Sequence, residues 1–127
     1  MNDKPAAIGH TTWVIPEGYI PTGEDESDRR FISHETACIL NCGDRDATVR
    51  ITLYYVDREP VGPYEVKVPA RRTLHLRFNE LTDPEEVPRD TDFASVIQAD
   101  NPIVVQHTRL DSRREALALL STMAFPA

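Results

Sequence analysis

The segment Gln106–Arg113, QHTRLDSR, gathers many of the side chains in this chain that could hold a ligand. Arg109 and Arg113 could make a forked contact with a carboxylate, while Gln106 and His107 offer neutral hydrogen bonds. These residue types suit recognition of a polar molecule better than catalysis. A structural alternative is equally open, in which Arg109 and Asp111 form a salt bridge that fixes the end of a strand.

A flat apolar wall for a ring-shaped ligand could come from Trp13 and Tyr54. The alternative is that the indole of Trp13 belongs to the hydrophobic core. Both readings leave Trp13 among the residues to locate in the structure.

The four histidines are His10, His34, His75 and His107, and Glu35 follows His34 directly. Three imidazoles and a carboxylate on neighbouring strands would suggest a metal-dependent enzyme of the cupin type. The chain has no His-x-His pair, however, and lacks the glycine-bounded spacing of histidine and glutamate that such enzymes display. We therefore predict hydrogen-bonded histidines in structural or interface positions, with no bound metal and no cofactor.

Other catalytic patterns have no support in the sequence. A Ser-His-Asp set could be assembled from Ser33 or Ser112 with His34 and Asp111, but no GxSxG motif surrounds either serine. Neither a P-loop nor a GxGxxG motif is present, so nothing favours nucleotide hydrolysis or dinucleotide redox chemistry. We predict that the protein is not an enzyme.

A small basic stretch consists of Arg71 and Arg72, followed by His75 and Arg77. It could contact a phosphate, a carboxylate or the backbone of DNA. The net charge of −7 works against general adhesion to nucleic acid. We therefore favour a strand whose cations face solvent or pair with acidic loops.

Length and composition indicate one globular domain, residues 1–127, with 40% hydrophobic and 28% charged residues. No apolar run approaches the ~18 residues that a membrane span needs, and the first residues lack the apolar core of a secretory signal. Cys38 and Cys42 lie too far apart on one extended strand to form a disulfide and could pair only if the strand turned before Cys42, so we expect two buried or half-buried thiols. These observations predict a cytoplasmic protein.

Alternation of apolar and polar residues indicates strands with one buried face. The predicted strands are Thr11–Ile15, Phe31–Leu40, Thr48–Val56, Tyr64–Val68 and Thr73–Phe78, with Phe93–Arg113 forming two strands joined by a short turn at Asp100-Asn101-Pro102. The C-terminal segment is ambiguous between helix and strand, and we expect a turn or short helical stretch near Ser112–Glu115 before a final strand. Seven or more short strands at this spacing predict an all-β protein, an antiparallel sandwich or jelly roll.

Several segments resemble one known family. They are Trp13 with PEGYIP, FISHETACILN, ITLYYVDREPVGPY, VPARRT, DTDFASVIQADNPIVVQHTRLDSR and ALLSTMAF. Because they cover most of the chain, it is identified as similar to the soluble transducers of microbial sensory rhodopsins, small cytoplasmic proteins best known from cyanobacteria.

This resemblance implies an antiparallel β-sandwich of jelly-roll type that assembles as a cyclic homotetramer and binds the cytoplasmic side of a photoreceptor. It also implies a place in a wider set of small-molecule binding domains, for sugars or related metabolites. Contact with DNA is a further possibility that the resemblance suggests. The family has no established catalysis. The matching motifs supply the ligand-binding candidates Trp13, His34, Glu35, Arg72, His75, Gln106, His107, Arg109 and Asp111.

The leading hypothesis is therefore a soluble cytoplasmic signalling adaptor that binds a sensory rhodopsin-like receptor and relays its state. Only a difference in affinity between receptor states could transmit a signal. The alternative is a small-molecule binding domain, for a sugar or metabolite, without a rhodopsin partner.

Overall fold

The computed structural model describes residues 7–22, 28–114 and 116–127. Within these ranges the chain forms strands and two short 3-10 helices, and no α-helix. The strands are β1 (His10–Ile15), β2 (His34–Asn41), β3 (Ala47–Tyr55), β4 (Val61–Val68), β5 (Arg72–Arg77), β6 (Phe93–Asp111), β7 (Ala118–Met123) and β8 (Phe125–Pro126), and the 3-10 helices are η1 (Arg29–Phe31) and η2 (Phe78–Glu80).

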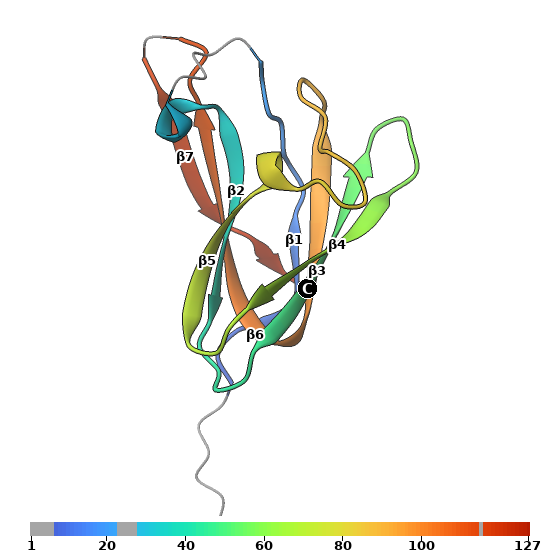
Figure 1. The fold of residues 1–127 in the computed structure, drawn as a ribbon, viewed down its shortest axis with the longest axis vertical. Coiled ribbons are helices and arrows are strands. Elements are labelled where there is room, and N and C mark those ends of the chain that lie inside the picture. Colours follow the sequence, from blue (N-terminus) through green and yellow to red (C-terminus); the bar gives the residue numbers. More distant parts are fainter. Residues whose placement is uncertain (1–6, 23–27, 115) are drawn as a thin grey trace, which may run out of the picture.

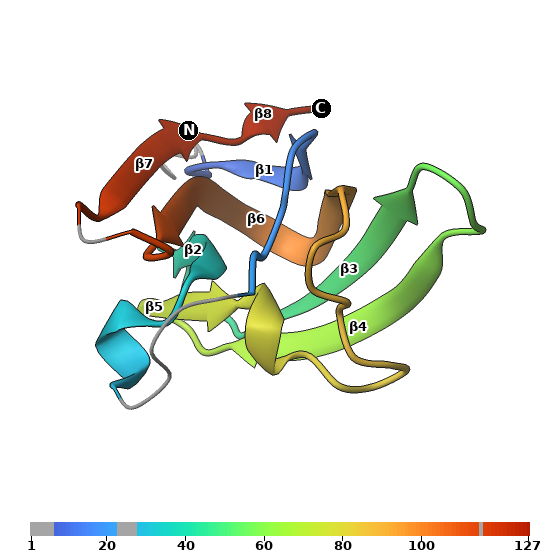
Figure 2. The same ribbon diagram turned by 90° about the horizontal axis from the view of Figure 1, so that it is seen from above.

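Two antiparallel sheets share the long strand β6. The first sheet has the order β4-β3-β6-β1-β8, and in the second β5 pairs with β2, β2 with β6, and β6 with β7. Figure 2 shows β6 between β3 and β4 on one side and β1, β7 and β8 on the other. The predicted all-β antiparallel sandwich is confirmed, while its jelly-roll connectivity stays a prediction.

The turn predicted at Asp100-Asn101-Pro102 is wrong, because Phe93–Asp111 forms one continuous strand. Its first part pairs with β3 and β1, and its last part pairs with β2 and β7. In Figure 1 this strand passes from the right-hand sheet, at β1 and β3, to the left-hand sheet, at β2 and β7. The change of partners therefore occurs inside the strand instead of at a turn.

The side chains that suggested a turn bond to a neighbouring segment instead. The backbone N–H of Thr48 donates to Asp100 Oδ1 at 2.8 Å, and Asn101 Nδ2 donates to the carbonyl of Asp46 at 2.8 Å. Pro102 has no Cα partner in the register of β1 or β2, and a proline fits a strand where no N–H is required. The three residues thus join the two halves of β6 to the start of β3.

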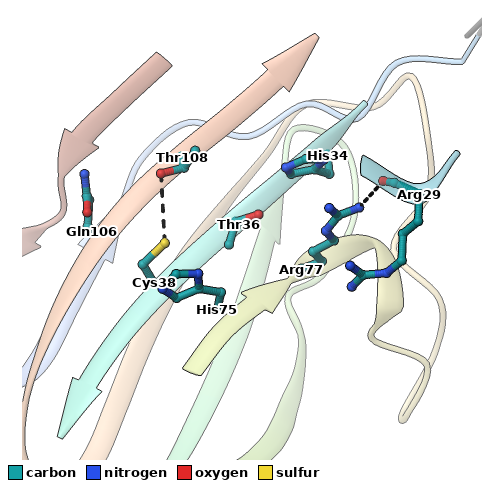
Figure 3. A pocket seen from close by; sticks show the side chains of 8 residues that line it. All are labelled: Arg29, His34, Thr36, Cys38, His75, Arg77, Gln106 and Thr108. Carbon is teal, nitrogen blue, oxygen red and sulfur yellow. Dashed lines mark hydrogen bonds between the residues drawn. The ribbon is translucent and has the colours of Figure 1, made fainter. Parts of the chain in front are cut away.

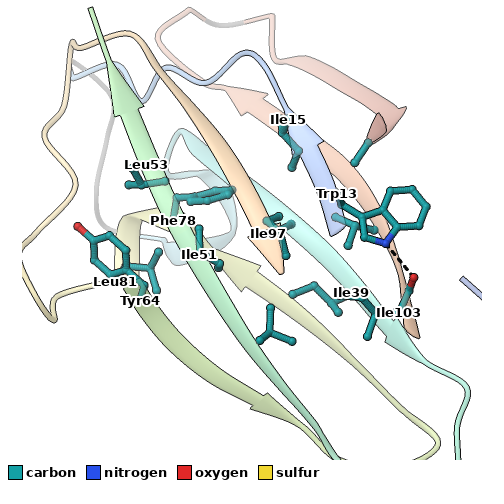
Figure 4. Packing of buried hydrophobic residues seen from close by; sticks show 14 of the residues in the cluster. Trp13, Ile15, Ile39, Ile51, Leu53, Tyr64, Phe78, Leu81, Ile97 and Ile103 are labelled. Carbon is teal, nitrogen blue, oxygen red and sulfur yellow. Dashed lines mark hydrogen bonds between the residues drawn. The ribbon is translucent and has the colours of Figure 1, made fainter. Parts of the chain in front are cut away.

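The hydrophobic core lies between the two sheets. Alternate residues of β3 are fully buried at Val49, Ile51 and Leu53, whereas Arg50 and Tyr54 are exposed, as the alternation predicted. Figure 4 shows the side chains of Ile51 and Leu53 facing core residues contributed by β2, β6 and η2. Burial of this apolar surface supplies the main stabilising free energy of the fold.

Several boundaries of the predicted strands differ from the structure, and β4 begins at Val61, three residues before the predicted Tyr64. Phe31 belongs to η1, whose cap is Asp28, since the N–H of Arg30 donates to Asp28 Oδ1 at 3.0 Å. β2 therefore begins at His34. The predicted C-terminal strand is present as β7, and Arg113 and Arg114 form a bend before it, while Glu115 lies outside the described residues.

Both cysteines are free thiols. Cys38 is half-buried on β2, whereas Cys42 is exposed in the turn before β3, where the sequence had suggested burial. No helix in the described ranges is long and apolar enough to cross a lipid bilayer.

Candidate functional site

Glu35 is fully buried at the centre of a charged cluster that we call the Glu35 network, made of Glu17, Glu35, His107 and Arg109. The Oε2 atom of Glu35 shares a hydrogen bond with Nε2 of His107, and Oε1 accepts from Nε of Arg109. The backbone N–H of Tyr19 donates to Oε1 at 3.1 Å. Both carboxylate oxygens are therefore occupied by partners from this chain.

The register of β2 and β6 explains why this cluster forms. Glu35 lies opposite Arg109, and His107 lies opposite Ala37, one pair further along the same inward face. Residues two apart on a strand share a face, so Glu35 reaches both of its partners on β6.

Arg109 connects the buried carboxylate to the surface. Burial alone would lower the pKa of the Arg109 guanidinium, but its hydrogen bonds and charge attraction to Glu35, and then to Glu17, outweigh burial and raise the pKa. Its Nη2 atom pairs with Glu17, which follows β1. The network thus attaches the segment after β1 to the start of β2 and the end of β6, and its role is structural.

A second group of polar residues faces outward from β2, β5 and β6. These residues line a groove of about 450 Å³, which we call the outer groove. Its lining consists of Arg29, His34, Thr36, Cys38, His75, Arg77, Gln106 and Thr108. In Figure 3 Arg29, His34 and Arg77 gather at one end, and Cys38, His75 and Gln106 lie toward the other.

Cross-strand pairing builds the floor of the outer groove in two rows. Thr36 is paired with Arg77 on one side and with Thr108 on the other. One step along, Cys38 is paired with His75 and Gln106. Directly paired residues of adjacent strands have Cβ atoms about 5 Å apart, so the backbone register fixes the spacing of the lining side chains.

His34 has a defined tautomer in the groove. Its Nδ1 atom lies 2.7 Å from the carbonyl of Ile32, which only accepts, so Nδ1 carries the proton and Nε2 is available to a ligand. Burial lowers the pKa of His34, and the positive charges of Arg77 and Arg29 lower it further, against the opposing effects of the Ile32 carbonyl and Glu35.

The structure separates the nine candidates predicted from the sequence. Glu35, His107 and Arg109 meet in the buried network, whereas His34, His75 and Gln106 line the outer groove. Adjacent residues of β2, such as His34 and Glu35, face opposite sides of the sheet and so belong to different sites.

The remaining three candidates lie apart from both groups. The Nε1 atom of Trp13 donates to the carbonyl of Ile103 at 2.9 Å, and the indole is 5% exposed within the core. Arg72 is exposed at the start of β5 and donates to the carbonyl of Arg71 at 3.0 Å. Asp111 pairs with Arg113 at 2.7 Å, whereas Arg109 pairs with Glu35 and Glu17, so the salt bridges differ from the Arg109–Asp111 pair considered as an alternative.

Sequence reasoning did not select Glu17, Arg29, Thr36 or Thr108 as ligand candidates, and it considered Arg77 only as part of the basic stretch that could contact a phosphate. Parity on the strands could have placed Thr36 beside His34 and Thr108 beside Gln106 on a shared outward face. Nothing in the local sequence marks Glu17 as a partner of Arg109, because 92 positions separate them.

Within the described ranges, no group of three or more His, Cys, Asp or Glu side chains is arranged to hold a metal ion.

Comparison with protein families gives a match over residues 8–126 to the family described as Anabaena sensory rhodopsin transducer. The chain belongs to this family. It is 61% identical to a solved structure of the Anabaena sensory rhodopsin transducer, with a TM-score of 0.74, over 81% of this chain and 100% of that one.

A second similar structure is a Thermotoga maritima protein designated 1070. This transducer-family chain is 32% identical to it, with a TM-score of 0.84, over 94% of this chain and 97% of the other. A comparison with curated proteins gave no match. The two solved structures show that the similarity in sequence is accompanied by a similar fold over 81% and 94% of this chain.

Proposed function

We propose that this chain is a signalling adaptor that binds a sensory rhodopsin-like receptor at its cytoplasmic side and relays the state of that receptor without catalysing a reaction. The observation that carries the proposal is membership of the transducer family over residues 8–126. The 61% identity to the Anabaena sensory rhodopsin transducer supports the same role. A cytoplasmic location is part of this proposal.

Signal transfer by such an adaptor requires that its affinity differ between the dark and the illuminated receptor. An adaptor that bound both states equally would leave their populations unchanged. A coupling free energy of ~1–3 kcal/mol is typical, which corresponds to a change in affinity of about 5- to 150-fold.

The decisive experiment is a binding titration against the receptor in lipid nanodiscs, in darkness and under continuous light. We expect saturable binding whose Kd differs between the two conditions by about fivefold or more. Empty nanodiscs serve as the control for adhesion to lipid. Absence of binding, or equal Kd values in light and darkness, would contradict the adaptor role.

The proposal includes self-assembly into a homotetramer through β7. All six residues of this strand are exposed, Leu119 to 72%, and within the described part of the chain its only pairing is with β6. Exposed leucines on an unpaired strand edge favour association with another strand. A second copy of this chain is the partner we assign to this edge.

A further inference from the structure

The outer groove carries positive charge in a chain whose net charge is −7. Among the residues that the structure describes, its lining includes Arg29 and Arg77 and the imidazoles of His34 and His75, but no carboxylate. We infer that the outer groove is a binding site for a small phosphorylated, hydroxyl-rich molecule, with the phosphate at the Arg29–His34–Arg77 end.

Arg77 is the strongest candidate for the phosphate contact. Its Nη1 atom donates to the carbonyl of Arg29 at 2.8 Å, which orients the guanidinium and leaves other N–H donors available. Among residues 7–22, 28–114 and 116–127 Arg77 makes no salt bridge, and Glu80, which pairs with Arg29, attracts it only at longer range. A phosphate would supply the close charged contact that Arg77 lacks.

His34 adds a second group at the same end. Its Nδ1–H is already bonded to the carbonyl of Ile32, so Nε2 is the atom that a ligand would meet. A ligand hydroxyl can donate to Nε2 when the imidazole is neutral, and a phosphate or hydroxyl oxygen can accept from it when the imidazole is protonated. Figure 3 shows His34 and Arg77 beside each other at this end of the groove.

The rest of the lining favours a hydroxyl-rich body. Thr36, Thr108 and Gln106 offer hydroxyl and amide groups, and the lining formed by the described residues contains no aromatic ring other than imidazole and no large aliphatic side chain. Thr108 is held by a hydrogen bond of 2.8 Å with Ser121 of β7. A volume of about 450 Å³ lies within the range of metabolite pockets.

A nucleic acid fits these observations less well. Binding to a duplex needs positive charge along many phosphates, and the net charge of −7 opposes a long negative partner. The groove itself offers only two arginines and two histidines, too few positive groups to follow many phosphates.

The inference does not depend on the proposed receptor role, because the groove can be tested without any receptor. The test is isothermal titration of the full chain at fixed ionic strength with glucose 6-phosphate and glycerol 3-phosphate, each compared with unphosphorylated glucose or glycerol. We expect binding of at least one phosphate ester and none of its neutral counterpart. Inorganic phosphate should bind more weakly, because it reaches only the cationic end.

Two substitutions locate the site. Arg77→Gln and His34→Gln should each weaken binding of the phosphate ester, the former by about ten- to a hundredfold, as expected for a hydrogen bond to a charged group. Arg50→Gln is the matched control, since it removes one positive charge from β3, where Arg50 pairs with Glu65 at 3.3 Å. Its affinity should equal that of the unchanged chain.

A measurement on the unchanged chain tests the site without any variant, so its result does not depend on whether a variant folds. In NMR spectra, addition of the phosphate ester should shift the ring signals of His34 and His75 and leave those of His10 and His107 in place. The inference is overturned if neither ester binds, if the neutral compounds bind equally well, or if Arg77→Gln binds as the unchanged chain does. Displacement of the ester by a short DNA duplex at equal concentration would also overturn it.

Discussion

Glu35 of β2 lies directly opposite Arg109 of β6, and the Nε atom of Arg109 donates to the Glu35 carboxylate inside the protein. The segment after β1 contacts both members of this pair, because the backbone N–H of Tyr19 donates to Glu35 and the carboxylate of Glu17 pairs with Arg109. Its charges are therefore matched by partners from three parts of the chain instead of by water.

Glu35→Ala should strongly destabilise the fold, because it leaves Arg109 and His107 without their buried partner. Removing one member of a buried ion pair costs about 3–5 kcal/mol in the free energy of unfolding. Denaturant unfolding at fixed protein concentration measures this loss. Glu17→Ala is the matched control, since Glu17 has a 62% exposed side chain and such a pair contributes less than ~1 kcal/mol. Equal losses in the two variants would contradict the assigned role of Glu35.

The stability of the protein should decrease on mild acidification, partly through His34. The pKa of His34 is lowered from 6.5 in the folded protein, chiefly by burial, so the unfolded chain takes up a proton first as pH falls. The loss begins near pH 6.5 and ends below the folded pKa. NMR titration should place the His34 midpoint below 6.5, and His34→Gln should flatten thermal stability between pH 7 and 5. A midpoint at or above 6.5 would contradict this prediction.

Tyr64 should contribute to stability through its hydroxyl group. This hydroxyl donates to the carbonyl of Glu85 at 2.7 Å and ties β4 to the segment after η2. Tyr64→Phe should therefore cost about 1 kcal/mol at neutral pH. Urea unfolding of the two proteins checks this value, and an unchanged midpoint would show that the bond contributes nothing.

Alkaline unfolding offers a second test of the same residue. Burial, followed by Tyr55 and Glu85, raises the pKa of Tyr64 from 10.0 to about 12. The unfolded chain therefore loses the phenolic proton first, and stability should fall as pH rises above 10. Urea unfolding between pH 9 and 11.5 should show a smaller decrease for Tyr64→Phe. Parallel decreases would mean that other groups cause the alkaline loss.

Leu119→Lys should dissociate the proposed tetramer, because it places a charge at the exposed edge strand β7. Light scattering should then report one chain of 14.4 kDa, in place of four times that mass for the unchanged protein. Val56→Lys is the control, since Val56 is 85% exposed immediately after β3 and away from β7. A tetramer that survives Leu119→Lys would exclude this part of β7 as the interface.

Local patterns predicted most strands well because the pleat of a strand sends alternate side chains to opposite faces. The burial of Val49, Ile51 and Leu53 follows from that rule alone. The rule does not reveal where a strand ends when residues that commonly form turns lie inside the strand and hydrogen-bond to another segment. Asp100 and Asn101 were misread for this reason, since their side chains bond to the backbone near β3.

The sequence predicted several residues of the candidate sites but not which of them lie together. His34, Glu35, His75 and His107 were identified by residue type, but a list of types does not divide them between two faces of a sheet. The division follows from the register that sets Thr36 beside Arg77 and Thr108, and Glu35 beside Arg109.

By itself the sequence determined an all-β chain, the positions of most strands and which residues of each strand share a face, because these properties depend on neighbours along the chain. Only the tertiary structure decided that β6 serves both sheets, that Glu35 and Arg109 are partners, and that three strands form a cationic groove. These relationships depend on which distant segments pair, and that choice is made by the packing of the whole core.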